Sequence, residues 1–78
     1  MPITTGQRPA AVSVYDYILC ETDTVGVPQY FGYEDRDGNW YIAQNNSGVW
    51  RYEIGVSDFS TAWTNRATQS YGYPSAKW

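Results

Sequence analysis

The chain has 78 residues with a formal net charge of −3, one cysteine and no histidine. A chain this short forms one domain that buries only about 60–65% of its unfolded surface, so its core is thin. Neither a disulfide nor a histidine-based metal site is available to reinforce that core, so association with copies of itself or with a larger partner is the expected source of added stability.

Charge and hydropathy exclude two further classes of partner. The five basic residues are scattered rather than clustered, and a phosphate backbone requires a basic patch, so we expect no direct nucleic-acid binding. No apolar run approaches the roughly 20 residues that span a bilayer, and residues 1–6 lack the charged start and apolar middle of a signal peptide. We therefore expect a soluble protein with no membrane partner, made inside a cell.

The chain begins with a segment that has no hydrophobic periodicity. Residues 1–11 contain proline and glycine among polar side chains, which predicts an extended N-terminal arm. Residues 12–70 are expected to form a single β-rich domain. Its first strand is predicted over residues 13–20, where β-branched and aromatic side chains predominate, and a loop is predicted over residues 21–28.

The strongest pattern lies in residues 29–54, where three apolar runs are separated by two turn sequences, which predicts a three-stranded antiparallel meander. The turn sequences are Asp37-Gly38 and Asn45-Asn46-Ser47-Gly48. A two-residue first turn and a four-residue second turn place Tyr33 across from Ile42, and Ile42 across from Arg51. The neighbouring row then contains Gly32, Ala43 and Trp50.

Side chains alternate between the two faces of a strand, so this register puts apolar and aromatic residues on both faces. One face carries Phe31, Tyr33, Trp40, Ile42 and Val49. The other face carries Tyr30, Tyr41, Ala43, Trp50, Tyr52 and Ile54. An ordinary half-exposed sheet is polar on one face, so this sheet either lies between two layers or presents an aromatic face to a partner.

The last part of the chain predicts one helix and a second arm. Residues 57–66 begin with capping side chains and continue with residues at helical spacing, which predicts a short helix on a sheet face. The residues at this spacing are Phe59, Ala62, Trp63 and Arg66. Residues 71–78 are predicted to form a C-terminal arm whose Tyr73 and Trp78 dock on a neighbouring subunit. The expected fold is therefore mainly β: a small antiparallel meander of three to four strands with one short helix and extended terminal arms.

Few residues are suited to catalysis or to holding a cofactor. Without histidine most pairs of nucleophile and base are excluded, and Cys20 is expected to be a small buried apolar group. The carboxylates of residues 34–37 surround a turn, where aspartate is favoured for backbone reasons. An overlap with a calcium-loop pattern fails because Tyr33 and Gln44 occupy its first and last ligand positions. We expect no enzyme activity, no metal site and no cofactor.

The aromatic side chains are the remaining candidates for binding. Such rings pack in a core or against a subunit, or they form a platform that stacks sugars or cations. We favour packing, because a glycan platform needs neighbouring amides and carboxylates that the sequence does not place, and a glycan is the alternative ligand. Gly32 and Ala43 are small and leave a slot above them on the sheet. We predict that the Trp50 ring fills this slot and is buried there. The candidate interaction residues are Tyr30, Tyr41, Trp50, Tyr52, Tyr73 and Trp78.

The stretch Asp37-Gly38-Asn39-Trp40-Tyr41-Ile42, followed by Gly48, resembles the aromatic hairpin of choline-binding and related cell-wall-binding repeats. Those repeats occur in tandem, and each aromatic cage is completed by the next copy. This chain contains a single copy. The function that this resemblance implies, a carbohydrate- or cell-wall-binding module, is the alternative for the chain.

A second resemblance rests on Gly38-Asn39-Trp40-Tyr41-Ile42 and Thr61-Ala62-Trp63-Thr64-Asn65-Arg66-Ala67, closed by Tyr71-Gly72. Together these stretches resemble short uncharacterised virion-associated proteins of tailed bacteriophages. The resemblance implies a non-enzymatic virion component, such as a capsid decoration, neck or tail accessory protein, synthesised in the host cytoplasm. Its implied partners are copies of itself in a homo-oligomer and other virion proteins, bound through aromatic sheet faces and arms.

Overall fold

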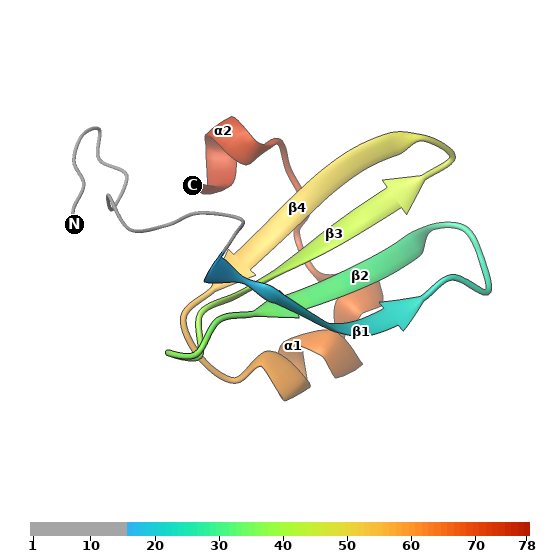
Figure 1. The fold of residues 1–78 in the computed structure, drawn as a ribbon. Helices are drawn as coiled ribbons and strands as arrows, with labels where there is room; N and C mark the ends of the chain where they lie inside the picture. Colours follow the sequence, from blue (N-terminus) through green and yellow to red (C-terminus); the bar gives the residue numbers. More distant parts are fainter. Residues whose placement is uncertain (1–15) are drawn as a thin grey trace.

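A four-stranded antiparallel sheet, in the order β1-β2-β3-β4, organises residues 16–78, the part of the chain that the computed structural model describes (Figure 1). Its strands are β1 Ile18–Asp23, β2 Gln29–Glu34, β3 Trp40–Asn46 and β4 Val49–Gly55. Each strand pairs with the next strand along the chain, so the mainly β fold and the predicted meander are confirmed. No helix in this range is long and apolar enough to cross a lipid bilayer.

Strand β1 lies further along the chain than the sequence predicts. It begins at Ile18 and continues to Asp23 through residues predicted to form a loop, because Glu21, Thr22 and Asp23 pair with β2. Such pairing overrides the low strand propensity of charged residues. Residues 13–15 and the predicted arm over residues 1–11 lie outside the described residues.

Cys20 is exposed, and the prediction that it is buried was wrong. It lies where the register between β1 and β2 shifts, between Leu19 and Glu21, in the manner of a β-bulge. An extra residue at a bulge is left unpaired. Because β1 is an edge strand, no neighbouring strand among the described residues covers Cys20 on its outer side. The Cys20 thiol contacts the carbonyl oxygen of Ile18 at 3.2 Å.

The loop between β2 and β3 is longer than the two-residue turn that Asp37-Gly38 predicts. Its last flanking pair is Glu34 and Trp40, so five residues lie between the strands. One carboxylate oxygen of Asp35 accepts hydrogen bonds from the backbone N–H groups of Asp37 and Asn39, each 2.9 Å long. The other accepts a hydrogen bond from the Asn39 side-chain amide at 2.9 Å. These bonds satisfy the backbone of the longer loop.

The turn between β3 and β4 is shorter than the predicted four-residue loop. Only Ser47 and Gly48 lie between the paired residues Asn46 and Val49. Both have positive φ, 55° for Ser47 and 91° for Gly48, as in the type I′ turns that match the twist of a hairpin. The Asn45 side-chain oxygen also accepts a hydrogen bond of 2.8 Å from the Gly48 N–H.

These two loops correct the predicted register. Ile42 lies across from Gly32 and Glu53, whereas the sequence placed it across from Tyr33 and Arg51. The one-residue error at β2 exchanges its two faces, while the two-residue error at β4 leaves its faces unchanged. Phe31 and Tyr33 therefore share a face with Tyr41 and Tyr52, and Tyr30 lies on the opposite face.

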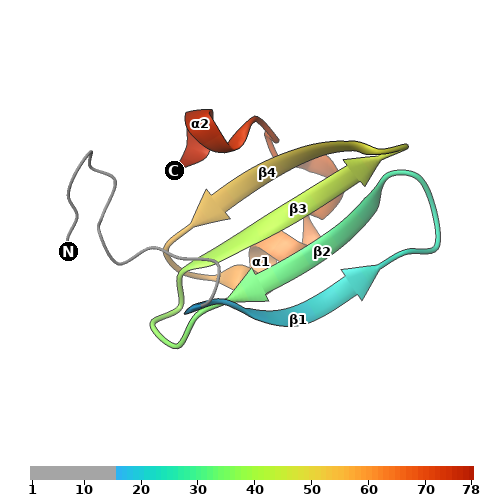
Figure 2. The ribbon, with the colours of Figure 1, turned by 45° about the horizontal axis from the view of Figure 1, so that its top comes forward.

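The face that carries Tyr30, Gly32, Trp40 and Ile42, here called the helix face, is covered by the helix α1, which spans Phe59–Thr64 (Figure 2). The 3-10 helix η2, Arg66–Thr68, follows directly. The core cluster on this face is Tyr30, Trp40, Ile42, Phe59 and Ala62, with Trp63 and Tyr71 packed against it. The predicted short helix is confirmed, and its apolar residues at helical spacing form its buried side.

The slot above Gly32 is filled from the helix. A Cβ atom built at Gly32 would lie 2.6 Å from a Phe59 ring carbon and 2.9 Å from a Trp63 ring carbon. The prediction that this slot holds Trp50 is therefore wrong. Trp40 uses a second slot in the same way, with its indole over Gly55 and its Nε1–H donating a 2.7 Å hydrogen bond to the Ser57 carbonyl oxygen.

Residues 71–78 pack against the sheet of their own chain, which differs from the predicted arm that docks on a neighbour. Tyr52 and Gly72 exchange two backbone hydrogen bonds, 2.7 and 2.8 Å long, along the outer edge of β4. The chain then forms the helix α2, Pro74–Lys77, and Figure 1 shows α1 and α2 on opposite sides of the sheet. A 3.0 Å ion pair joins Lys77 to Glu53 of β4.

Gly32→Ala should destabilise the fold by about 1–3 kcal/mol, because the added methyl group displaces the Phe59 and Trp63 rings. Urea unfolding followed by circular dichroism measures the change. Gly26→Ala is the matched control, since a Cβ atom built at Gly26 meets nothing within 4 Å. An equal urea midpoint for the two variants would show that α1 does not depend on close approach to the sheet.

Candidate functional site

The face opposite α1, here called the aromatic face, carries rings from every strand except β1 and from both flanking segments. These rings are Tyr17, Phe31, Tyr33, Tyr41, Trp50, Tyr52 and Trp78. They divide into a cluster centred on Tyr41 and a separate pair formed by Phe31 and Trp50. The two groups differ in burial and therefore in what they can do.

Tyr41 is the centre of the first group and is only 7% exposed. It stacks on Tyr33 at 4.4 Å between ring centroids and receives Tyr17 edge-on at 5.0 Å and Trp78 edge-on at 5.2 Å. Tyr52 completes the group at 5.7 Å from Trp78. Burial raises the pKa of Tyr41 to about 12. This cluster is a second, smaller core that holds the last residue of the chain on the sheet.

Phe31 and Trp50 form the second group, near the other end of the aromatic face. Their ring centroids lie 5.7 Å apart with planes tilted by 32°. They come from β2 and β4 on either side of β3, where Phe31 pairs with Ala43 and Trp50 pairs with Asn45. Trp50 remains 42% exposed and Phe31 is half-buried, so Trp50 is the ring of this pair that is open to solvent.

The structure brings together only part of the predicted interaction set. Tyr41, Tyr52 and Trp78 meet in the cluster, and Trp50 lies further along the same face. Tyr30 lies in the core of the helix face, where its ring is 5.9 Å from that of Tyr71. Its predicted place on the aromatic face is a consequence of the register error.

Tyr73, the sixth predicted interaction residue, is exposed beside β4. The Arg51 guanidinium lies 4.0 Å from the centre of its ring and donates a 3.0 Å hydrogen bond to its hydroxyl oxygen. Tyr73 and Trp50 are thus the two members of the predicted set that retain large exposed rings.

The sequence prediction missed the outer edge of β1. No described strand pairs with this edge, and its apolar residues are open, with Ile18 69% and Leu19 50% exposed. Edge strands expose unpaired N–H and C=O groups that can pair with another chain. The sequence signal that marks this edge is the pair of acidic residues Glu21 and Asp23, because charged side chains are typical of edge strands.

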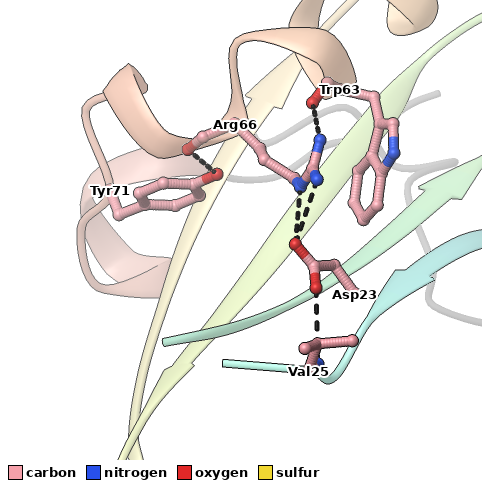
Figure 3. A network of polar contacts seen from close by, with 5 residues as sticks. All are labelled: Asp23, Val25, Trp63, Arg66 and Tyr71. Atoms are coloured by element: carbon pink, nitrogen blue, oxygen red, sulfur yellow. Dashed lines mark hydrogen bonds and ion pairs between the residues drawn. The ribbon is translucent and has the colours of Figure 1, made fainter. Parts of the chain in front are cut away.

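A polar clamp ties the end of β1 to the helical segment (Figure 3). Arg66 donates hydrogen bonds of 3.2 and 3.0 Å from Nε and Nη2 to one oxygen of Asp23, and one of 2.9 Å from Nη1 to the Trp63 carbonyl oxygen. The Tyr71 hydroxyl donates to the Arg66 carbonyl oxygen at 2.7 Å. Hydrogen bonding from Arg66 lowers the pKa of the Asp23 carboxyl group. The clamp holds the edge strand in place from one side and leaves its outer edge open.

Within residues 16–78, no group of three His, Cys, Asp or Glu side chains is placed to hold a metal ion. No protein-family model, no curated protein and no solved structure matches the chain. A functional proposal for this chain therefore rests on its surfaces: the open edge of β1 and the exposed Trp50 ring of the aromatic face.

Trp40→Ala and Trp50→Ala should have very different effects on stability. Trp40 is buried over Gly55, so its truncation should cost about 3–5 kcal/mol in the free energy of unfolding. Trp50 is partly exposed, so its truncation should cost about 1 kcal/mol. Urea titrations of both variants give the comparison, and a loss at Trp50 as large as that at Trp40 would place Trp50 in a core.

Stability should fall in alkali as Tyr41 ionises. The folded protein holds the Tyr41 proton more tightly than the unfolded chain, so the contribution is complete below pH 10 and is lost as the pH rises toward about 12. In Tyr41→Phe the decrease in urea midpoint over this range should be smaller than in the parent protein. An unchanged alkaline decrease would show that Tyr41 does not control it.

Proposed function

We propose that this protein is a non-enzymatic structural component of a bacteriophage particle that binds neighbouring subunits through the open edge of β1 and the apolar side chains beside it. The observation that carries the binding mode is the exposed edge, with Ile18 and Leu19 turned to solvent. The resemblance of the second half of the chain to virion-associated proteins of tailed phages supports the location, as a capsid decoration, neck or tail accessory protein.

The two edges of the sheet differ, and the difference favours binding at β1. Gly72 pairs with Tyr52 along the edge of β4, and α2 packs beside it. The outer edge of β1 has no such cover among residues 16–78. A strand from a neighbouring subunit can extend the sheet at an open edge, where main-chain hydrogen bonds supply affinity and alternate side chains supply specificity.

The clamp between Asp23 and Arg66 makes this edge suitable for binding. Because the guanidinium and the carboxylate join β1 to the helical segment with a 3.0 Å ion pair, the strand is already held in its extended form before a partner arrives. A preformed edge loses less conformational entropy on association than a loose segment. Partners of this kind include a second copy of the chain and another virion protein.

Ile18→Lys combined with Leu19→Lys should abolish association while leaving the fold intact. Both side chains are exposed, so lysine costs little in the monomer, but charge on an edge strand opposes pairing with another strand. Sedimentation of the purified protein and its copy number in assembled particles provide the readouts, and circular dichroism checks the fold.

Val56→Lys is the matched control, because Val56 is an exposed apolar residue that directly follows β4, the strand at the other edge of the sheet. It should associate like the parent protein. If the β1 variant still enters particles in full copy number, the binding surface lies elsewhere and the proposal fails.

A further inference from the structure

One end of the sheet is poor in charged side chains. It is formed by the connection between β1 and β2 and by the turn between β3 and β4, which Figures 1 and 2 show at the same end of the molecule. Residues 24–32 and 42–50 contain no acidic or basic residue. The opposite end of the sheet, around the loop between β2 and β3, contains the acidic residues Asp16, Glu34, Asp35, Asp37 and Asp58. The nearest charged groups are already paired: Asp23 with Arg66, and the Arg51 guanidinium with the Trp50 carbonyl oxygen and the Tyr73 hydroxyl.

The ring pair Phe31 and Trp50 lies at this end, with Trp50 exposed and Phe31 half-buried. Trp50 pairs with Asn45, one position from the end of β3, and its ring centroid lies 5.7 Å from that of Phe31. Its exposure of 42% is much larger than that of Trp40 in the core. The two tilted rings form a shallow aromatic platform that the fold does not need for its own core.

Amide side chains lie in the same cross-strand row as the platform. Gln29, Asn45 and Trp50 are successive partners across β2, β3 and β4, so their side chains point to one face. The Asn45 side-chain oxygen is bonded to the Gly48 N–H, which leaves its NH₂ group without an acceptor among the described residues. The Gln29 side chain makes one long hydrogen bond, 3.4 Å, to the Thr24 carbonyl oxygen. Both amides thus retain unused donors or acceptors beside the rings.

We infer that Trp50, Phe31, Asn45 and Gln29 form a binding site for a neutral oligosaccharide. A pyranose ring presents an apolar C–H face, which stacks on an aromatic ring, and hydroxyl groups at its rim, which exchange hydrogen bonds with amides. A shallow platform with a few polar groups at its border meets both requirements. The four residues of the site are themselves uncharged, so none of them can form an ion pair with a charged sugar, and we expect a neutral sugar to be preferred. This site goes beyond the proposed function and uses residues separate from the β1 edge.

The test is an NMR titration of the full chain with cellohexaose and maltohexaose as neutral probes and oligogalacturonate as the anionic probe. The indole Nε1–H signal of Trp50 and the side-chain amide signals of Asn45 and Gln29 should shift with at least one neutral probe. The indole signal of Trp40 is an internal control and should stay in place, because that N–H is bonded to the Ser57 carbonyl oxygen inside the fold. Oligogalacturonate should cause smaller shifts.

Variants then assign the site. Trp50→Ala should weaken binding of the neutral probe by about tenfold or more, since loss of an aromatic contact of about 1.4 kcal/mol corresponds to a factor of ten. Gln29→Leu, which keeps the size of the side chain and removes its amide, should also weaken binding. Val56→Ala shortens an exposed apolar side chain beyond the other end of β4 and should bind like the parent protein.

Three results would overturn the inference: no shift at Trp50 with either neutral probe at millimolar concentration, tighter binding of the anionic probe, or full binding by Trp50→Ala. A further arm separates a sugar from a protein partner at this end. Val25 is 97% exposed in the loop beside the platform, and Val25→Ser should leave sugar binding unchanged. If Val25→Ser and Trp50→Ala both abolish entry into particles and no sugar binds, the platform is a protein contact.

The outcome is independent of the proposed association through β1. The variant with lysine at residues 18 and 19 should bind the neutral probe like the parent protein, whether or not it has lost association. Trp50→Ala should in turn retain the sedimentation behaviour of the parent protein. A negative result for sugar binding therefore leaves the proposed association through β1 untouched, and a negative result for association leaves the sugar site untouched.

Discussion

The carboxylate of Asp35 determines the length of the loop between β2 and β3, and the rest of the structure depends on that length. By accepting three hydrogen bonds from Asp37 and Asn39, it stabilises five residues between the strands instead of two. A loop shorter or longer by one residue would turn Phe31 and Tyr33 toward α1 and bring Tyr30 to the other face. Gly32, which has no side chain, would then no longer lie beneath Phe59 and Trp63, and α1 would lose the site on the sheet against which it packs.

The chain has many aromatic side chains for its length, and two segments of different size cover many of them, one on each face of the sheet. Helix α1 and Tyr71 cover the helix face, and the C-terminal residues pass around β4 to place Trp78 on Tyr41. Together these covers enclose the middle of the sheet from both sides with a minimum of chain. The large apolar side chains that they leave exposed include Ile18 and Leu19 on the β1 edge and Trp50 on the aromatic face, the residues on which the two proposals rest.

The sequence predicted the elements well and the spatial relations between them poorly. Alternation of apolar residues identified β2, β3 and β4, and helical spacing identified α1, because these patterns are local and each follows from a single period. The register depends on side-chain hydrogen bonds made by Asp35 and Asn45, whose effect on loop length is not visible in turn propensities. For the same reason the ring of Trp50, expected in the slot at Gly32, lies instead on Phe31.

The pairing of Gly72 with Tyr52 has a consequence for the size of any assembly. A sheet with two free edges can add strands without limit, which is how short β segments grow into fibres. Here Gly72 is bonded to Tyr52 in the middle of β4, so within residues 16–78 that edge is interrupted while the β1 edge is open. Under the proposed association, two molecules that meet through β1 present only interrupted β4 edges on the outside of the pair. A single pair of backbone hydrogen bonds thus makes the β4 edge a poorer template for further strands than the β1 edge.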